Sequence, residues 1–465
     1  MVQNGGGMVI LLPDNTSALS PEEKQQLFEL EEELLSEEIT VPLYFTQETP
    51  QITEVYDSVK TDSSVDQASS GAEALLKSVT ANGFQMVVNG PNSAALGEFQ
   101  ITNIQGKLSG HGIEEQLPTV AVVAHYDAFG IAPALAYGAD SDASGVTAVL
   151  ELARIFSKLY TNSRTHAKFN ILFLLSGGGK FNYQGTKRWI EDNQENADSS
   201  LLTDVSFVLC LDALGNEDQL HLHVSKPPKE GSPGDTFLKH LKEVSSSLFP
   251  SVEFGMVHKK INLAQDTLAW EHERFSIKRL PAFTLSHLDT HDNKIRRSIL
   301  DTRDGVDVQK LSRNTKIIAE ALARYVYNFT DQGQTQIFTD TLDVQESLVT
   351  AWMDYLTSEP RGTQLLNKDH QMLATLEHTM ERYLKDVRRT TVKPDKRDPE
   401  FMFYSGAEFS MHAYSVKPAI FDLILALGIA AYLALLYLLG QNFPTVYTGL
   451  KRLVGPKPMA VEKRQ

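Results

Sequence analysis

The chain has 465 residues, of which 42% are hydrophobic and 22% charged, so it is large enough for a globular domain with accessory segments. Its net charge of −16 argues against nucleic-acid binding, because phosphates demand basic surfaces. A single cysteine, Cys210, excludes an internal disulfide, and its apolar neighbours predict a small buried side chain.

Residues 1–71 predict a truncated accessory α/β segment that ends in a linker. The expected elements are a strand at residues 8–12, an acidic helix at residues 22–38 and a strand at residues 40–45. Residues 58–71 are rich in Ser and Asp, which is typical of a flexible connection.

Residues 72–330 predict the main domain, built around three buried strands. These short apolar runs, rich in β-branched residues, lie at residues 119–124, 169–175 and 205–211. Polar or glycine residues follow each run, at the carboxyl ends where open α/β sheets form their sites. We therefore place the candidate site where these strands end.

Four short motifs occupy these strand ends in order. They are HYD at residues 125–127, GADSDASG at 138–145, GGGK at 177–180, and Asp212. The order resembles the co-catalytic zinc aminopeptidases, with H-x-D, G-A-x-D-[ND]-x-S-G, E-E, an Asp and a late His. The resemblance spans residues 119–307 and implies a three-layer sandwich with a mixed central sheet. Such enzymes hold two zinc ions and use a Glu as general base.

Three positions keep the residue types that the resemblance implies. His125 matches the first zinc ligand, Asp127 the carboxylate that orients it, and Asp212 a further ligand of the same zinc. The bridging Asp falls on Ser141, although a shift of one residue would recruit Asp140 or Asp142 instead.

The remaining positions of the motif are replaced. The Glu-Glu pair falls on Gly178 and Gly179, or on Gly179 and Lys180, and residues 176–184 contain no carboxylate in any register. The late His falls on Arg297. Zinc takes three or four protein ligands in such sites, and the added cations disfavour it further. We therefore expect no bound metal, no cofactor and no catalytic residue.

An alternative is a degenerate but active aminopeptidase with one zinc. It would use His125, Asp212 and either His287 or His291, whose spacing differs from the family pattern. Zinc content and chelator-sensitive hydrolysis of aminoacyl substrates distinguish the two hypotheses.

Two other clusters of candidate ligands have simpler explanations. His221 and His223 share one face of a strand, which we interpret as its solvent-exposed face. His272 and Glu273 are interpreted as the solvated end of a charged helix.

Residues 331–417 predict a helical stalk and a juxtamembrane linker. Helical periodicity covers residues 342–356 and 369–388, and the basic stretch 390–399 indicates a solvated connection.

Residues 418–440 predict one transmembrane helix. The run 423–439 carries no charge, and the segment reaches the roughly 20 residues that a bilayer crossing needs. The tail, residues 441–465, has five Lys or Arg residues against one acid, Glu462. The positive-inside rule therefore places the tail in the cytosol and the main domain on the luminal side.

Two glycosylation sequons, at Asn15 and Asn328, agree with a luminal domain. Such a domain needs a signal peptide, and residues 1–7 do not form one. We therefore expect a sequence that lacks its true start. The alternative, a tail-anchored protein with a cytosolic domain, is opposed by the basic tail.

Longer blocks, followed by a single span, resemble the nicalin family of nicastrin-like membrane glycoproteins. The blocks are SGGGKFNYQGTKRW at 176–189, NLAQDTLAWEHERF at 262–275, LPAFTLSHL at 280–288 and KDVRRTTVKPDKRDPEF at 385–401. The resemblance implies a non-catalytic subunit in the endoplasmic reticulum membrane. Its implied partners are the nodal modulator protein, a small multi-spanning membrane protein and the Sec translocon. It also implies roles in the biogenesis of multi-spanning membrane proteins and in Nodal signalling.

Overall fold

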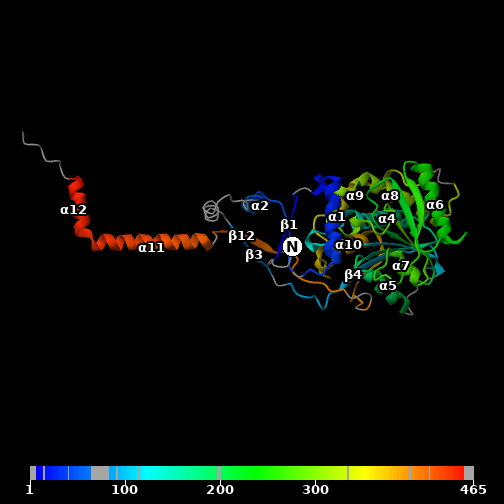
Figure 1. Cartoon of the computed structure of the whole chain (residues 1–465). Coiled ribbons are helices and arrows are strands. Elements are labelled where there is room, and N and C mark those ends of the chain that lie inside the picture. Colours follow the sequence, from blue (N-terminus) through cyan, green and yellow to red (C-terminus); the bar gives the residue numbers. More distant parts are fainter. Residues whose placement is uncertain are drawn as a thin grey trace, which may run out of the picture. The chain divides into compact units, whose positions relative to one another are not determined.

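The computed structural model describes residues 7–13, 16–39, 41–63, 83–90, 93–113, 116–195, 201–331, 335–395, 397, 401–417 and 419–454. Asn15, the expected start of the main domain at residue 72, Pro418 and the end of the tail lie outside these residues. The chain forms two compact units, Met1–Thr46 with Pro91–Glu408, and Gln47–Gly90 with Phe409–Gln465. Figure 1 gives the positions of the elements along the chain.

The first unit is built on an eight-stranded mixed sheet. Its strands, in sheet order, are β11 (Lys385–Val392), β4 (Ile101–Leu108), β6 (Asn170–Ser176), β5 (Thr119–His125), β7 (Val205–Leu211), β10 (Ala282–Ser286), β8 (Gln219–Val224) and β9 (Glu253–His258). The central strands β6, β5, β7 and β10 run parallel. The pairs β11–β4, β4–β6 and β10–β8 are antiparallel, and β9 is parallel to β8. Strands that are buried on both faces read as continuous apolar runs, which is why the sequence revealed β5, β6 and β7.

Helices cover both faces of the sheet, so the predicted three-layer sandwich is confirmed (Figure 1). One face carries α4 (Ser144–Thr161), α6 (Pro233–Leu248), α8 (Val308–Tyr327), α9 (Glu346–Leu356) and α10 (Gln371–Tyr383). The other carries α5 (Gln184–Glu195) and α7 (His272–Ile277). Alternate residues of β5 enter the two cores: Val120 and Val122 the first, Ala121 and Val123 the second. Cys210 is buried in the second core, as predicted.

The expected stalk is wrong, because residues 346–392 belong to the main core. Helices α9 and α10 bury Val349, Met353 and Leu373 in the cluster that contains α4. The helix expected over residues 369–388 ends at Tyr383, and β11 follows, paired with β4. Strand β11 is an edge strand whose charged side chains are mostly exposed, so its sequence lacks the apolar run of a buried strand.

The accessory segment forms a small sheet and a helix. Strands β1 (Met8–Leu12) and β2 (Leu43–Gln47) pair, and α1 (Pro21–Ser36) lies between them in sequence. Ser20 and Glu23 form a capping box that fixes the start of α1. Within the first unit, Glu31 of α1 accepts a hydrogen bond from the backbone of Ile299.

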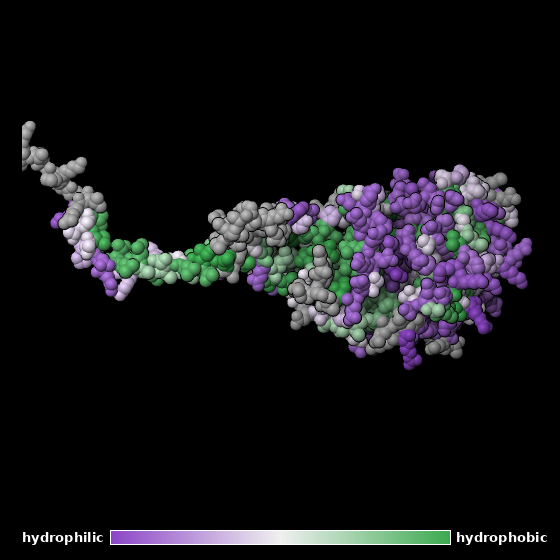
Figure 2. Space-filling model, viewed as in Figure 1, coloured by the Kyte–Doolittle hydropathy of each residue, from purple (hydrophilic) through white to green (hydrophobic). Residues whose placement is uncertain are grey.

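The second unit joins segments that are far apart in the sequence. Strand β3 (Gly83–Asn89) pairs antiparallel with β12 (Ser410–Val416), and α2 (Pro50–Ser63) occupies part of the expected linker. Two helices follow, α11 (Ala419–Gln441) and α12 (Phe443–Val454). In the described part of the chain one helix, Ile420–Gln441, is long and apolar enough to cross a membrane. Figure 2 shows its continuous hydrophobic surface.

Candidate functional site

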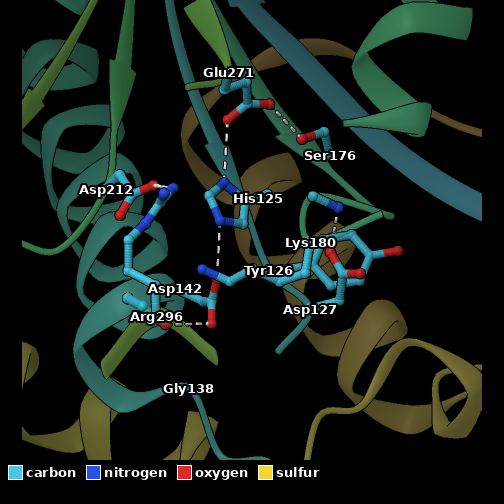
Figure 3. A network of polar contacts seen from close by, with 12 residues as sticks. His125, Tyr126, Asp127, Gly138, Asp142, Ser176, Lys180, Asp212, Glu271 and Arg296 are labelled. Carbon is cyan, nitrogen blue, oxygen red and sulfur yellow. Dashed lines mark hydrogen bonds and ion pairs between the residues drawn. The ribbon is translucent and has the colours of Figure 1, made fainter. Parts of the chain in front are cut away.

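Polar side chains from several strand ends meet at one edge of the main sheet (Figure 3). His125 ends β5, Ser176 ends β6, Asp212 follows β7 and His287 follows β10. All four are buried. Because β5, β6, β7 and β10 are parallel neighbours, their carboxyl ends lie at the same edge.

His125 is enclosed between two carboxylates. Its Nδ1 lies 3.2 Å from Oε2 of Glu271, and its Nε2 lies 2.9 Å from Oδ1 of Asp142. Burial would lower the pKa of His125, but the hydrogen bonds to Asp142 and Glu271 outweigh burial and raise the pKa to about 10. This pKa keeps the imidazole protonated at neutral pH, with Nδ1 donating to Glu271 and Nε2 ion-paired with Asp142. A protonated imidazole has no lone pair for a metal.

Lys180 lies on the other side of Asp142. Its Nζ is 3.0 Å from the Oδ1 atom that also contacts His125. Burial would raise the pKa of Asp142, but Lys180 and His125 lower it to about 2. Asp142 is thus a carboxylate shared by two buried cations.

A π-helical turn explains why Asp142, and not Ser141, reaches His125. The turn, η4 (Ala139–Ala143), closes with the N–H of Ala143 donating to the carbonyl of Gly138 at 3.0 Å, five residues back. The extra residue in this wider turn places Asp142, rather than Ser141, beside His125, which is one of the one-residue shifts that the sequence left open. The Ser141 hydroxyl instead donates to Oδ2 of Asp142 at 2.8 Å.

Gly138 makes this turn possible. Its φ of +57° lies in the left-handed region, and a Cβ there would approach Oδ2 of Asp142 to 2.1 Å. Asp301 accepts hydrogen bonds from the backbone N–H groups of Asp140 and Ser141, at 2.7 and 2.9 Å, and so fixes the same turn.

Asp212 is paired with an arginine. Nη2 of Arg296 lies 2.6 Å from Oδ2 of Asp212, and the guanidinium stacks 4.4 Å from the Trp270 ring centre. Burial opposes the charge of Asp212, but Arg296 and Lys180 lower its pKa. Sequence spacing had placed Arg297 at the late-His position. The arginine that binds Asp212 is Arg296, the residue before Arg297, and Arg297 itself lines an adjacent cavity.

Asp127 and the glycines complete the pocket. Asp127 accepts hydrogen bonds from the N–H of Gly179, at 2.9 Å, and from the hydroxyl of Thr363. Burial raises the pKa of Asp127. A Cβ on Gly179 would lie 2.4 Å from the His125 ring, so this backbone leaves no room for a side chain there. Gly178, the other replaced position, is also buried, beside Gly179.

The histidines of the single-zinc alternative are paired elsewhere. Nε2 of His287 lies 2.5 Å from Oδ2 of Asp140, and the pKa of His287 is raised because this contact outweighs burial. Nε2 of His291 lies 3.0 Å from Asp292. Among the ion pairs of the described residues, none joins His287 or His291 to His125 or Asp212.

Three of the four residues in the other two clusters, His223, His272 and Glu273, are buried, so a solvent-exposed interpretation is wrong for them, whereas His221 is half-buried. His223 is stacked 4.2 Å from Trp270, and its Nε2 donates to the carbonyl of Leu288 at 2.8 Å. His272 and Glu273 are each only 1% exposed. Charged and polar side chains can be buried when they are paired, so charge alone was a poor guide to exposure.

This donor set does not fit a pair of zinc ions. Within the described ranges, no group of three or more His, Cys, Asp or Glu side chains is arranged to hold a metal ion. Nδ1 of His125 is hydrogen-bonded to Glu271 and Nε2 is ion-paired with Asp142. Lys180 and Arg296 bring positive charge to Asp142 and Asp212. The site is a neutralised network of ion pairs.

Comparisons with known proteins identify the family of the chain. A family model described as Peptidase family M28 matches residues 103–322. The BOS complex subunit ncln of Danio rerio is 55% identical to the chain, over 98% of the chain and 83% of that relative. Nicalin of Caenorhabditis elegans is 29% identical, over 96% of the chain and 81% of that relative. The chain belongs to the nicalin family.

Among solved structures, the gamma-secretase component nicastrin resembles this nicalin-family chain in fold. The TM-score is 0.55 at 12% sequence identity, over 81% of this chain and 78% of that chain. At this identity the likeness describes the fold alone.

A cavity of about 620 Å³ adjoins the network. Lys180, Arg296 and Arg297 lie on its wall, together with aromatic side chains and the loop at residues 264–269. The cavity is therefore bordered by three cationic side chains next to the network of ion pairs.

Several residues of the site were missed from the sequence. Glu271 lies in the block at residues 262–275 that resembles the nicalin family, so a signal for it existed. Arg296, Arg361 and Thr363 carry no local signal, because the fold brings them from distant turns. The guanidinium of Arg361 donates to the carbonyls of residues 126, 137 and 138 at 2.6, 2.6 and 2.7 Å.

Proposed function

We propose that this chain is a non-catalytic, membrane-anchored scaffold subunit. One observation carries the proposal: the positions that resemble zinc ligands are engaged in the ion pairs Lys180–Asp142, His125–Asp142 and Arg296–Asp212. A buried cation at this distance opposes a second cation by Coulomb repulsion in a medium that screens poorly. The carboxylates of the pocket are therefore compensated by protein cations, which oppose the binding of a metal ion.

The general base is also missing. In the resembling enzymes a Glu follows the strand that corresponds to β6, where this chain has Gly178, Gly179 and Lys180. Glu271, which lies 3.2 Å from Nδ1 of His125, accepts hydrogen bonds from Ser176 at 2.7 Å and Thr186 at 2.5 Å. These donors hold Glu271 as a structural acceptor.

Helix α11 would anchor the chain in the endoplasmic reticulum membrane, with the M28-type domain in the lumen. The basic tail supports this orientation through the positive-inside rule. Asn328, at the end of α8, is exposed and begins a sequon, which suits a luminal glycan.

The partners of the scaffold follow from the family. The relative in Danio rerio is named as a subunit of the BOS complex, and we propose that this chain assembles into a complex of the same kind. By resemblance, its partners would be the nodal modulator protein, a small multi-spanning membrane protein and the Sec translocon. Its role would be to assist the biogenesis of multi-spanning membrane proteins and to modulate Nodal signalling.

The test combines metal content with partner recovery. The full chain is expressed with a tag in zinc-supplemented cells, extracted in mild detergent, and analysed for zinc, for aminoacyl-substrate hydrolysis and for co-purifying proteins. We expect far less than one zinc per chain, no chelator-sensitive hydrolysis, and recovery of membrane-protein partners.

The opposite result is one tightly held zinc per chain with chelator-sensitive hydrolysis, both lost in His125→Ala. The matched control is His378→Ala, since the side chain of His378 is 78% exposed and remote from the strand ends. That result would replace the scaffold hypothesis with the single-zinc aminopeptidase.

A further inference from the structure

The chain continues as a second helix directly beyond α11. Only Asn442 separates α11, which ends at Gln441, from α12, which starts at Phe443. Pro444 lies in the first turn of α12, lacks an N–H group and crowds the carbonyl four residues earlier, so the α11 hydrogen-bond ladder ends here. The two helices are therefore distinct elements joined by a minimal connection.

One face of α12 is apolar. Phe443, Val446, Tyr447 and Leu450 follow the i, i+3, i+4, i+7 spacing that places side chains on one side of a helix. Phe443, Tyr447 and Leu450 are 64%, 57% and 55% exposed. The rings of Phe443 and Tyr447 stack with centroids 6.1 Å apart. This face is open to its surroundings in the part of the chain that the structure describes.

The opposite side of α12 is polar and leads into the basic tail. Thr445 and Thr448 lie away from the apolar stripe, and Lys451 flanks it. In the sequence, Arg452, Lys457, Lys463 and Arg464 follow with one acid, Glu462. Figure 2 shows both hydrophobic and hydrophilic side chains on α12.

Chain connectivity restricts where this helix can lie. Helix α11 has 23 residues, which exceeds the roughly 20 needed to cross the hydrocarbon layer, so α12 is not required to complete a crossing. If α11 spans the bilayer, one residue of connection holds the first turn of α12 at the membrane surface. An apolar stripe with aromatic residues, beside basic residues, is the pattern of interfacial helices.

We propose that α12 lies along the membrane surface, with Phe443, Tyr447 and Leu450 inserted at the boundary between headgroups and acyl chains. Lys451, at the edge of the apolar stripe, then faces anionic headgroups. The occupant of the apolar face is thus the lipid bilayer itself. This proposal rests on the proposed span of α11 and adds a second, surface-bound element to the anchor.

Site-specific fluorescence tests the proposal on the full chain in vesicles of phosphatidylcholine and phosphatidylserine. An environment-sensitive thiol probe is attached to Leu450→Cys on the apolar face, Thr448→Cys on the polar face or Leu433→Cys in the middle of α11. The native Cys210 is fully buried, so the wild-type chain serves as the unlabelled control.

For Leu450→Cys we expect blue-shifted emission, protection from aqueous acrylamide and stronger quenching by lipids with a spin label near the carbonyl end than near the methyl end. Interfacial helices insert their apolar face about 5–10 Å, which is the depth of that shallow label. Thr448→Cys should be quenched by acrylamide. Leu433→Cys should be quenched most by the deep label.

Two results would overturn the proposal. One is equal acrylamide access at positions 448 and 450 while position 433 is deeply quenched, which rejects the surface helix and keeps the span. The other is protection of position 450 only after a partner protein is added, which assigns the face to protein. Acrylamide access at position 433 would instead reject the span, and with it the anchor of the proposed function.

Discussion

At the scale of single residues, Asp212 depends on Arg296 for its charge. Removal of one partner of a buried ion pair leaves an uncompensated charge. We expect Arg296→Met to reduce the free energy of unfolding by about 3–5 kcal/mol, because the pair is 2.6 Å long and both side chains are nearly inaccessible. Thermal unfolding of the full chain in detergent measures this change.

Two further variants control the Arg296→Met experiment. Lys239→Met breaks an exposed pair with Asp235 on α6 and should leave the unfolding midpoint nearly unchanged. The double variant Arg296→Met/Asp212→Asn removes both charges and should recover most of the lost stability. Equal destabilisation by the single and double variants would show that Arg296 acts through packing on Trp270.

His223 should make the fold acid-sensitive. Burial lowers its pKa to about 4, although the hydrogen bond to Leu288 opposes this shift. An unfolded histidine has a pKa of about 6.5, so between these values the unfolded chain binds a proton that the folded chain excludes. The His223 contribution is complete above pH 6.5 and is lost as the pH falls toward 4, by about 1.4 kcal/mol per pH unit.

The matched variant is His223→Gln, whose amide can donate to Leu288 and does not titrate. Unfolding free energies measured from neutral to mildly acidic pH should fall less steeply for His223→Gln than for the wild type. Parallel curves would show that the pKa of His223 is the same in the folded and the unfolded chain, which contradicts the prediction.

At the scale of elements, the π-helical turn η4 requires a glycine at its start. Gly138→Ala would hold a Cβ residue in the left-handed region and press it against Asp142. We expect a loss of about 1–3 kcal/mol in unfolding free energy. Gly305→Ala is the control, because Gly305 begins no left-handed turn and a Cβ there would meet no atom within 4 Å. Similar midpoints for the two variants would contradict the assigned role of Gly138.

The elements that the sequence predicted well are those with a strong apolar pattern. The runs for β5, β6 and β7 lie within a residue of the observed bounds, because strands buried on both faces contain few polar residues. Strand β11 was expected as the end of a helix and a solvated connection, since an edge strand tolerates KDVRRTTV. Its identity comes from pairing with β4, which is a tertiary interaction.

The candidate site was predictable in place but not in detail. Strand order located His125 and Asp212 at one edge, because parallel strands align their carboxyl ends. A π-helical turn adds one residue to a helix without a clear sequence signal, so the choice between Ser141 and Asp142 stayed open. Arg296 replaced the expected Arg297 because the short 3₁₀ helix η5 (Lys294–Arg297) sets which side chain turns inward.

At the scale of the whole molecule, Asn328 reports the side of the membrane on which the main domain lies. If the domain is luminal, the sequon at Asn328 should carry a glycan, because the residue is exposed at the end of α8. Asn328→Gln should remove one endoglycosidase-sensitive step in mobility, and the comparison variant Asn15→Gln should leave that step in place. The domain should also resist protease in sealed microsomes, and digestion without added detergent would place it in the cytosol.

Arg361 and β11 also have a consequence for synthesis. Arg361 clamps the backbone of residues 126, 137 and 138, and β11 closes the edge of the sheet beside β4, yet both follow the segment that matches the peptidase family. A ribosome builds the chain from its N-terminus, and domains fold as they emerge. The hydrogen bonds from Arg361 to the loops around His125 therefore form only after most of the chain before α11 has been made. The residues that complete this fold and those of helix α11 are thus made in adjacent steps of translation.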